Sequence, residues 1–440
     1  MSTVAKKVIM GSGAVGEVDV IEQSLLFNND AAHLKRTPGA AGNRRTWTLS
    51  FWAKNLMAAD GGSFFGADLG SFYFEIEVGA IKFAWNYSSA WQIKLVPDRL
   101  LRDPSSWYHI LLAVDTTQGT AANRVKMYFN GVQETSFDSN NNTFPSQNLE
   151  TPMNGAYEHF IGATRANERS ANSYLAEMHL LDGAVKAPSD FIETNSDTGQ
   201  LVPKEYVGGS YGTNGFYLKF ASGALGTDSS GEGNNYTAVN LANSDVVIDT
   251  PNNNFATLLP FAGFGTYASN TPTTTAITTS EGNLVGTGAS GINGSGSMAV
   301  SAGKWYWEVM VIGSSGYGHA GIYGYGSGRI SDSLRVDNGN KYRFMLNADD
   351  GEWQYATNGG SFSSAVAITG DGGNAVNGPW AASLTCFGTG SKLHFNFGQN
   401  GTFNGAATAG GNADSGGVGD FFYAPPSGYL ALCTANLPDP

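Results

Sequence analysis

Short runs rich in Val, Ile, Phe, Tyr and Trp recur along this 440-residue chain, separated by clusters of Gly, Asn, Ser and Asp. Apolar residues at the 3.6-residue spacing of a helix are nearly absent, whereas a spacing of two recurs, as in TWTLSFWAK (46–54). In a strand, successive side chains point to opposite faces. One face of this segment therefore carries Trp47, Leu49 and Phe51, and the other carries Thr48, Ser50 and Trp52. The pattern predicts an all-β chain, with the first of these faces in a core and the second half exposed.

Two Asn-Gly pairs predict tight turns. Asn130-Gly131 ends the run VKMYF, and Asn358-Gly359 ends the run EWQYAT. Asn-Gly is a strong hairpin signal, because both central residues of a type I′ turn need positive φ. Each half of the chain is therefore expected to contain such a hairpin.

The spacing of the strand candidates, roughly ten to twenty residues, is typical of β-sandwiches. We expect two β-sandwich domains joined by an ordered, turn-rich connector, with the segment TPTTTAITTS as the boundary before the second domain. The predicted division is an N-terminal arm at 1–20, a first domain at 21–195, the connector at 196–280 and a second domain at 281–440.

Charge and composition exclude some partners. The net charge of −13 disfavours binding to nucleic acid, which needs clustered Lys and Arg. No apolar stretch reaches 18 residues, so no membrane insertion is expected, and the N-terminus lacks the apolar core of a signal peptide. The six histidines stand singly, without metal-ligand spacing. Cys386 and Cys433 are expected to be buried thiols at the ends of C-terminal strands, with one bridge between them as the alternative.

Residues 20 to 195 resemble the concanavalin-A-like (laminin-G-like) jelly-roll domains of bacteriophage structural proteins. The matching pieces come in family order: SLLFNN, HLKRT, TWTLSFWAK, WYHILLAVDTT, RVKMYFNG and YLAEMHLLDG. Residues 281–400 are similar to SPRY-type sandwiches through KWYWEV, YRFMLNADDGEWQYATNGG and LHFNFGQNGTF. The connector and the terminal PPSGYLALCTANLP resemble segments of phage tail-fibre and receptor-binding chains. The first ten residues match no tail-attachment domain, and there is no collagen-like or coiled-coil shaft.

This resemblance implies a virion surface protein made in the host cytoplasm. The expected function is that of a phage tail-fibre or tail-tip receptor-binding component that engages a host-surface glycan, with other virion proteins as partners. A homo-oligomer is expected, and a trimer is favoured by analogy. The alternative is a purely structural virion protein, such as a head decoration, a fibre or a tail component without glycan binding. No enzymatic activity and no cofactor are expected.

Aromatic clusters suggest where a sugar would bind, since sugar faces stack on rings while polar neighbours bond hydroxyls. In FAWNYSSAWQIK, Trp85, Tyr87 and Trp91 lie within seven residues, and Trp85 and Tyr87 share a strand face. The alternative is one side of the core plus a hairpin tip.

The second domain contains a similar stretch. Tyr317, Tyr323 and Tyr325 alternate with glycines in SGYGHAGIYGYGSGR, which suits adaptable contact loops. Packing of a glycine-rich strand pair explains this stretch equally well.

Two further candidates have simpler interpretations. Glu75 and Glu77 would share a strand face, as the carboxyl pair of a retaining glycan hydrolase must, but we expect them on a solvated outer face. Oxygen-bearing side chains also alternate around two glycines in TDSSGEGNN. These four residues are Asp228, Ser230, Glu232 and Asn234, and their side-chain oxygens suit Ca²⁺. The expected structure is nevertheless a turn that is hydrogen-bonded to its own backbone.

Overall fold

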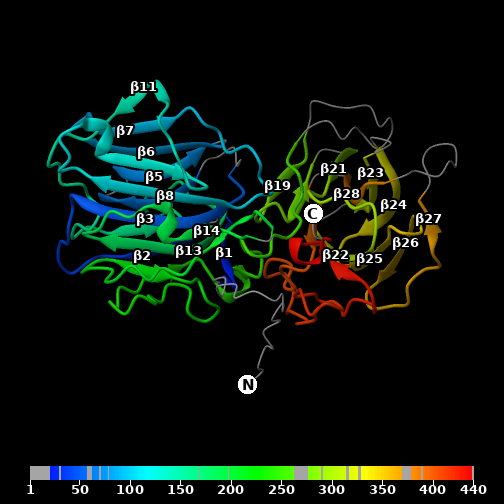
Figure 1. Cartoon of the computed structure of the whole chain (residues 1–440). Coiled ribbons are helices and arrows are strands. Elements are labelled where there is room, and N and C mark those ends of the chain that lie inside the picture. Colours follow the sequence, from blue (N-terminus) through cyan, green and yellow to red (C-terminus); the bar gives the residue numbers. More distant parts are fainter. Residues whose placement is uncertain are drawn as a thin grey trace.

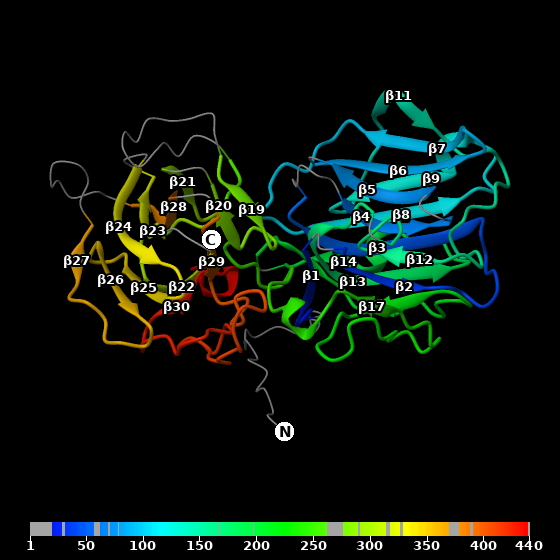
Figure 2. The ribbon, with the colours of Figure 1, turned by 180° about the vertical axis from the view of Figure 1, so that it is seen from behind.

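The computed structural model describes residues 20–28, 31–56, 62–68, 71–77, 79–166, 168–196, 198–261, 276–288, 291–313, 317–325, 329–368, 378–387 and 390–438. Its regular structure is almost entirely β, interrupted by 3-10 turns such as Pro188–Asp190. The all-β prediction is confirmed. The strands form two β-sandwiches that lie side by side (Figures 1 and 2). Nowhere in these ranges does a helix have the length and apolarity needed to cross a membrane.

Sheet 1 of the first sandwich is antiparallel and is centred on β3 (Thr46–Lys54). Its strand order is β10-β9-β8-β3-β13-β1-β18, and β16 also pairs with β13. The remaining bounds are β1 (Ser24–Asn28), β8 (Tyr108–Asp115), β9 (Val125–Phe129), β10 (Val132–Gln133), β13 (Asn172–Asp182), β16 (Phe216–Leu218) and β18 (Val246–Val247).

Sheet 2 faces sheet 1 and is also antiparallel, in the order β11-β7-β6-β5-β4-β12-β2-β17. Its strands are β2 (His33–Arg36), β4 (Gly62–Ala67), β5 (Phe72–Glu77), β6 (Ala80–Tyr87), β7 (Ala90–Pro97), β11 (Phe137–Thr143), β12 (His159–Ile161) and β17 (Thr237–Val239). The first aromatic cluster lies on two neighbouring strands of this sheet, with Trp85 and Tyr87 on β6 and Trp91 on β7.

The core of the first sandwich lies between these sheets, and alternation on β3 explains it. Trp47, Leu49 and Phe51 are fully buried, and the Trp47 ring meets Phe83 of sheet 2 edge-on at 6.1 Å. The expectation that the opposite face of β3 is half exposed is wrong, because Thr48, Ser50 and Trp52 are also buried. A small hairpin, β14 (Ile192–Thr194) and β15 (Leu201–Pro203), covers this face through apolar side chains such as Phe191.

The second sandwich has one large and one small sheet. Sheet 3 has the order β19-β20-β29-β22-β25-β26-β27, with β30 parallel to β22, and sheet 4 has the order β21-β28-β23-β24. The bounds are β19 (Thr278–Ser280), β20 (Val285–Thr287), β21 (Ile292–Ser295), β22 (Lys304–Ile312), β23 (Tyr317–Gly324), β24 (Arg329–Asp337), β25 (Lys341–Asn347), β26 (Glu352–Thr357), β27 (Val366–Ala367), β28 (Trp380–Phe387), β29 (Lys392–Asn396) and β30 (Leu430–Ala431). Trp307 and Phe344 stack in its core.

Both Asn-Gly pairs form the predicted turns. The φ angles are 48° and 79° at Asn130 and Gly131, and 46° and 79° at Asn358 and Gly359. The first turn joins β9 to β10 directly. The second is followed by irregular chain before β27 pairs with β26. Cys386 and Cys433 are free and buried, as expected, and burial raises the pKa of each thiol to about 12.

The predicted connector contributes to the first sandwich. Strands β16, β17 and β18 each add to sheet 1 or sheet 2, and the chain reaches the second sandwich where Ala256 N–H donates to the Leu432 carbonyl at 2.9 Å. The division into domains stays a prediction. All but the last residue of its arm (1–20) and the first half of its boundary segment (271–280) lie outside the described residues.

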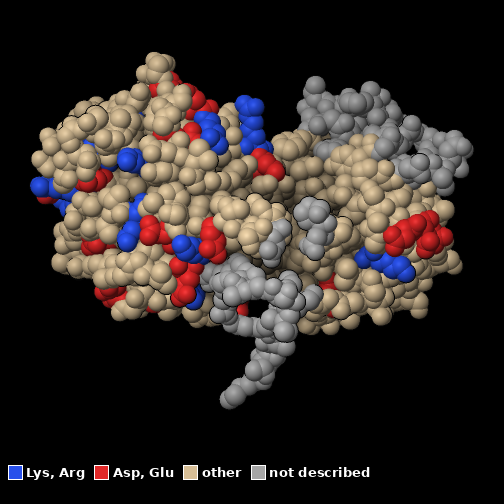
Figure 3. All heavy atoms as spheres, in the orientation of Figure 1, with Lys and Arg blue, Asp and Glu red and all other residues tan. Residues whose placement is uncertain are grey.

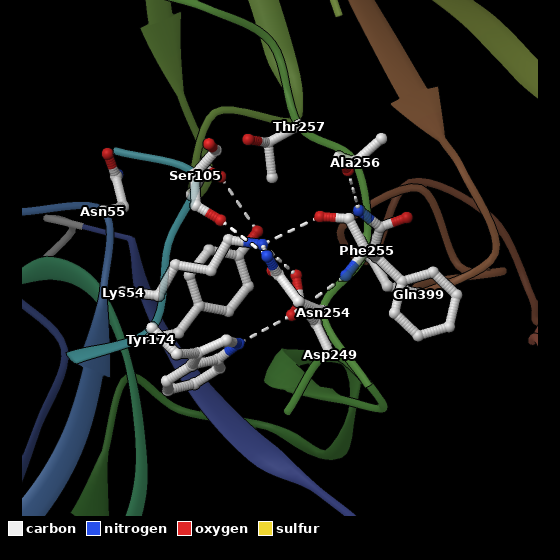
Figure 4. A network of polar contacts seen from close by, with 12 residues as sticks. Lys54, Asn55, Ser105, Tyr174, Asp249, Asn254, Phe255, Ala256, Thr257 and Gln399 are labelled. Carbon is white, nitrogen blue, oxygen red and sulfur yellow. Dashed lines mark hydrogen bonds and ion pairs between the residues drawn. The ribbon is translucent and has the colours of Figure 1, made fainter. Parts of the chain in front are cut away.

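A buried polar network joins the two sandwiches (Figure 4). The ammonium of Lys54 has no solvent exposure and bonds Asp249 at 2.6 Å, Asn254 at 2.7 Å and the Phe255 carbonyl at 2.9 Å. The Tyr174 hydroxyl donates to the Gly282 carbonyl at 2.9 Å. These contacts run from the middle of sheet 1 into chain segments that pack on the second sandwich.

Candidate functional site

The hairpin between β6 and β7 ends in a strained turn. Tyr87 pairs with Ala90, so Ser88 and Ser89 form a two-residue loop, with φ of 51° and 63°. Both values lie in the left-handed region that such turns require and that Asn or Gly occupies at lower cost. Strain of this kind persists where surrounding structure or function maintains it.

A bulge next to this turn reverses the direction of one aromatic ring. Trp85 pairs with Ile93, but Asn86 pairs with Trp91, so the register shifts and Gln92 is the extra residue. Counted back from Ile93, which points into the core, regular alternation without the bulge would point Trp91 into the core as well. With it, Trp91 shares a face with Asn86, on the outside of sheet 2. Bulges re-aim side chains in this way beside binding sites.

Four side chains meet on this outer face, and we call Tyr73, Lys82, Lys94 and Trp91 the Trp91 cluster. The Lys82 ammonium lies 4.8 Å from the centre of the Tyr73 ring and 5.9 Å from that of Trp91. The Lys94 ammonium lies 4.9 Å from the Trp91 ring. These are cation–π distances. Ala84 lies among these side chains on the outer face, opposite Lys94, and is fully buried although it points away from the core. The larger side chains of the cluster therefore cover the sheet beneath them.

Glu75 lies beside the cluster and is almost completely buried, with 1% exposed. Its carboxylate bonds the Lys82 ammonium at 3.0 Å and the Arg169 guanidinium at 2.8 Å. Burial alone would lower the pKa of Lys82, but hydrogen bonds to Tyr73 and Glu75 outweigh burial and raise it. Lys82 is therefore a fixed cation.

A loop from β12 to β13 brings Arg169 to this position. A Cβ atom on Gly66 would lie 2.2 Å from the Thr164 carbonyl oxygen, so only glycine lets the loop cross β4 this closely. The Arg169 carbonyl accepts a hydrogen bond from Ser63 N–H at 3.0 Å, and Arg169 has a φ of 48°. Its guanidinium remains half exposed.

The predicted rings of this stretch do not form one platform. Trp85 lies in the core with 7% exposed, and Tyr87 packs against it at 5.8 Å. Tyr87 is 58% exposed at the hairpin tip, on the core-side face of the strand. Trp91, 39% exposed, points the other way and joins Tyr73 and the two lysines.

The three tyrosines of the second sandwich are also dispersed. Tyr317 stacks on Phe387 at 5.0 Å and holds the Arg335 guanidinium 3.9 Å from its ring centre. Tyr323 is buried, with Tyr325 edge-on to it at 5.0 Å and 39% exposed. Both alternatives for this stretch therefore have support, namely strand packing for Tyr323 and an exposed ring for Tyr325.

The two glutamates of β5 have different environments. Glu77 is exposed, whereas Glu75 is buried between its two cations, so the expectation that both lie on a solvated face is wrong for Glu75. Its environment depends on Arg169, which is 94 residues away in the sequence. Strand alternation cannot reveal this partner.

The turn considered for calcium is closed by its own hydrogen bonds. The Asp228 carboxylate accepts bonds from the backbone N–H groups of Tyr217, Ser230 and Asn234, at 2.8–2.9 Å, and from the Ser230 hydroxyl. These bonds lower the pKa of Asp228 although burial opposes them. Glu232 instead accepts a bond from Ser210. The described residues contain no group of three or more His, Cys, Asp or Glu side chains placed to hold a metal.

Comparison with known proteins defines the class of the first sandwich. Residues 28–189 match the family described as the concanavalin A-like lectin/glucanases superfamily. With its two antiparallel sheets, this part of the chain is a concanavalin A-like jelly roll. The match covers less than half of the chain.

The more particular comparisons are weak. The chain is similar to a heptameric pentraxin from Limulus polyphemus (16% identity, TM-score 0.29, covering 38% of this chain and 80% of the other). It is also similar to a putative carbohydrate-binding protein from Bacteroides ovatus (14%, TM-score 0.33, covering 51% and 59%) and to the SPRY domain of human HERC1 (14%, TM-score 0.20, covering 26% and 87%). A search of curated proteins gives no match. At these scores the structural likenesses support no conclusion about function.

Proposed function

We propose that this chain is a virion surface protein, a bacteriophage tail-fibre or tail-tip component, whose first sandwich binds a host-surface glycan at the Trp91 cluster. The observation that carries the binding site is the bulge at Gln92, which turns Trp91 from the core to an exposed face beside Tyr73. A sugar ring stacks on such a surface while neighbouring polar groups bond its hydroxyls. The match to a lectin/glucanase superfamily supports the same class of ligand.

The virion part of the proposal rests on the sequence resemblance to phage tail proteins. It includes a location on the particle, other virion proteins as partners, a homo-oligomer with a trimer favoured, and a SPRY-like second sandwich. Localising the chain in an intact particle would test this part directly.

Binding without catalysis fits the carboxylates better than hydrolysis does. A glycan hydrolase needs two carboxyl groups on either side of the scissile bond. Glu75 is buried in two ion pairs, so a substrate cannot reach it without breaking them. We therefore propose a non-enzymatic chain that needs no cofactor, and saccharide cleavage assays would test this.

The decisive change for the binding site is Trp91→Ala. Because the ring is partly exposed and lies outside the core, the free energy of unfolding should change by less than about 1 kcal/mol. Loss of the stacking surface should weaken glycan binding roughly tenfold, equivalent to ~1.4 kcal/mol. Chemical denaturation measures the first effect, and binding to a glycan array and adsorption to host cells measure the second.

Two neighbouring rings serve as controls. Trp85→Ala removes a core ring and should cost about 3–5 kcal/mol of stability. Tyr87→Ala removes an exposed ring on the opposite face and should leave both stability and binding nearly unchanged. Normal binding by Trp91→Ala would contradict the proposed site. An absence of glycan binding by the unmodified protein would favour the purely structural virion role.

A further inference from the structure

Three cationic side chains lie on the outer face of sheet 2, and two of them pair with a single buried carboxylate. Lys82 and Arg169 both pair with Glu75. Lys94 approaches the Trp91 ring, and no carboxylate of a described residue lies within ion-pair distance of it. The group therefore holds three positive charges against one negative charge that solvent cannot reach.

Two acidic residues lie nearby without neutralising this group by direct contact. Glu77 is exposed, two residues beyond Glu75 on the same strand face. The Asp138 carboxylate of β11 accepts bonds from the Asn140 N–H and the Asn141 amide. Those bonds lower the pKa of Asp138, and the positive charge of Lys94 lowers it further.

The surface as a whole does not attract anions. The net charge of the chain is −13, and acidic and basic side chains are interspersed over the face drawn in Figure 3. A local excess of cations beside an exposed tryptophan is therefore a feature of this site and not of the molecule.

We infer that the Trp91 cluster selects a sugar residue that carries a carboxylate, such as a hexuronic acid. The inference rests on the proposed function and specifies its ligand. The sugar ring stacks on Trp91, and the carboxylate accepts a charge-assisted hydrogen bond from the Lys94 ammonium beside that ring. Glu75 stays buried and holds Lys82 and Arg169 in place, so these cations lose little conformational freedom when the ligand binds.

Paired probes test this directly. Acidic polysaccharides and their carboxyl-reduced counterparts, in which each carboxylate becomes a neutral hydroxymethyl group, would be printed on one array with neutral polysaccharides. The intact protein should bind the acidic form at least about tenfold more tightly than its reduced partner, as loss of one charge-assisted contact implies. The preference should weaken as salt concentration rises.

Single variants separate charge from stacking. Lys94→Gln should lower affinity for the acidic probe about five- to tenfold and should lower affinity for any neutral probe by a smaller factor, so that the acidic preference shrinks. Trp91→Ala should weaken binding to every probe. Lys35→Gln is the matched control, because Lys35 is also a surface lysine of sheet 2 but pairs with Glu158 away from the cluster.

The outcomes test selectivity for an acidic sugar separately from glycan binding itself. Equal binding to acidic and reduced probes, still sensitive to Trp91→Ala, would overturn the acidic selectivity and leave glycan binding intact. No binding to any probe would overturn both. An acidic preference that Lys94→Gln does not change would also contradict the inference, because the charge would then be recognised elsewhere.

Discussion

Three of the buried carboxylates among the described residues, Glu75, Asp249 and Glu308, are compensated in three different ways. Glu75 has two cations, and Asp249 has the Lys54 ammonium and the Trp107 indole N–H. Glu308 has only neutral donors, which are the Tyr306 hydroxyl, the Asn396 amide and the N–H groups of residues 422 and 423. Neutral donors compensate burial less completely than a cation does. Burial accordingly raises the pKa of Glu308 to about 7, although the hydrogen bonds oppose the rise.

This raised pKa predicts how stability depends on pH. Between about pH 4.5 and 7 the folded chain binds a proton at Glu308 that the unfolded chain has released, so the contribution of Glu308 to the free energy of unfolding falls as pH rises through this window. His109, His159 and His394 act in the opposite sense, because burial lowers the pKa of His109 from 6.5 to about 3 and those of His159 and His394 to about 4, and their contributions are lost as pH falls. In the unmodified protein the histidine contributions oppose that of Glu308.

Glu308→Gln isolates the first effect. The stability of the unmodified protein relative to this variant should decline by roughly 3 kcal/mol as pH rises from 4.5 to 8, at about 1.4 kcal/mol per unit of pKa shift. Urea unfolding at a series of pH values measures the difference. A constant difference would show that the pKa of Glu308 is not shifted, and a rising difference would show that the donors lower it.

At the scale of elements, the tight turns set the strand registers. The turn at Asn130-Gly131 has positive φ at both residues, and a Cβ atom on Gly131 would lie 3.4 Å from the Ile192 side chain. Gly131→Val should therefore reduce the free energy of unfolding by about 1 kcal/mol or more. Gly119→Val is the control, because Gly119 has no positive φ and no neighbouring atom within 4 Å of its Cβ position. Equal melting temperatures for the two variants would contradict the turn geometry.

Strands with alternating aromatic residues were predictable from the sequence, and polar or glycine-rich strands were not. The strands β3, β8, β22 and β25 lie where the alternation predicts them. The edge strand β11, with sequence FDSNNNT, is largely exposed and has few apolar residues whose alternation could indicate a strand. The glycine-containing β4 gave no clear signal either.

The candidate site was predictable only in part. Its tryptophan stood out as one ring of an aromatic stretch, and Lys82 could have been placed on the outer face by alternation with Ile81 and Phe83. A bulge decides on which face of the sheet the Trp91 ring lies, and no residue of this segment indicates that bulge in the sequence. The contribution of Arg169 depends on a loop crossing that only the folded chain reveals.

At the scale of the whole molecule, the Lys54 network should hold the two sandwiches together. Burial lowers the pKa of Lys54 and raises that of Asp249, so the pair is stable only because its partners are in place. We expect limited proteolysis to cut at residues 1–20 and near 271–280, giving two protected fragments. In the unmodified protein these fragments should co-elute in size-exclusion chromatography, because their contacts survive the cut.

Lys54→Met should allow the nicked fragments to separate, since it leaves Asp249 buried without a cation. Lys35→Met, at an exposed ion pair, should not. A single protected core with no cut near residue 275 would contradict the two-domain division. Separation of the unmodified fragments would contradict the role assigned to the network.

The bulge at Gln92 also has an evolutionary consequence. Trp91 follows Ala90, which pairs with Tyr87, so deletion of Gln92 alone would remove the bulge and leave Trp91 opposite Asn86 on the outer face. Moving the extra residue from position 92 into the turn would instead place Trp91 opposite Tyr87 on the inner face, while Ile93 and the core positions after it keep their partners. The recognition surface is therefore inherited through the length of the turn, and a lineage of such chains would lose it by lengthening this loop by one residue at the expense of the bulge.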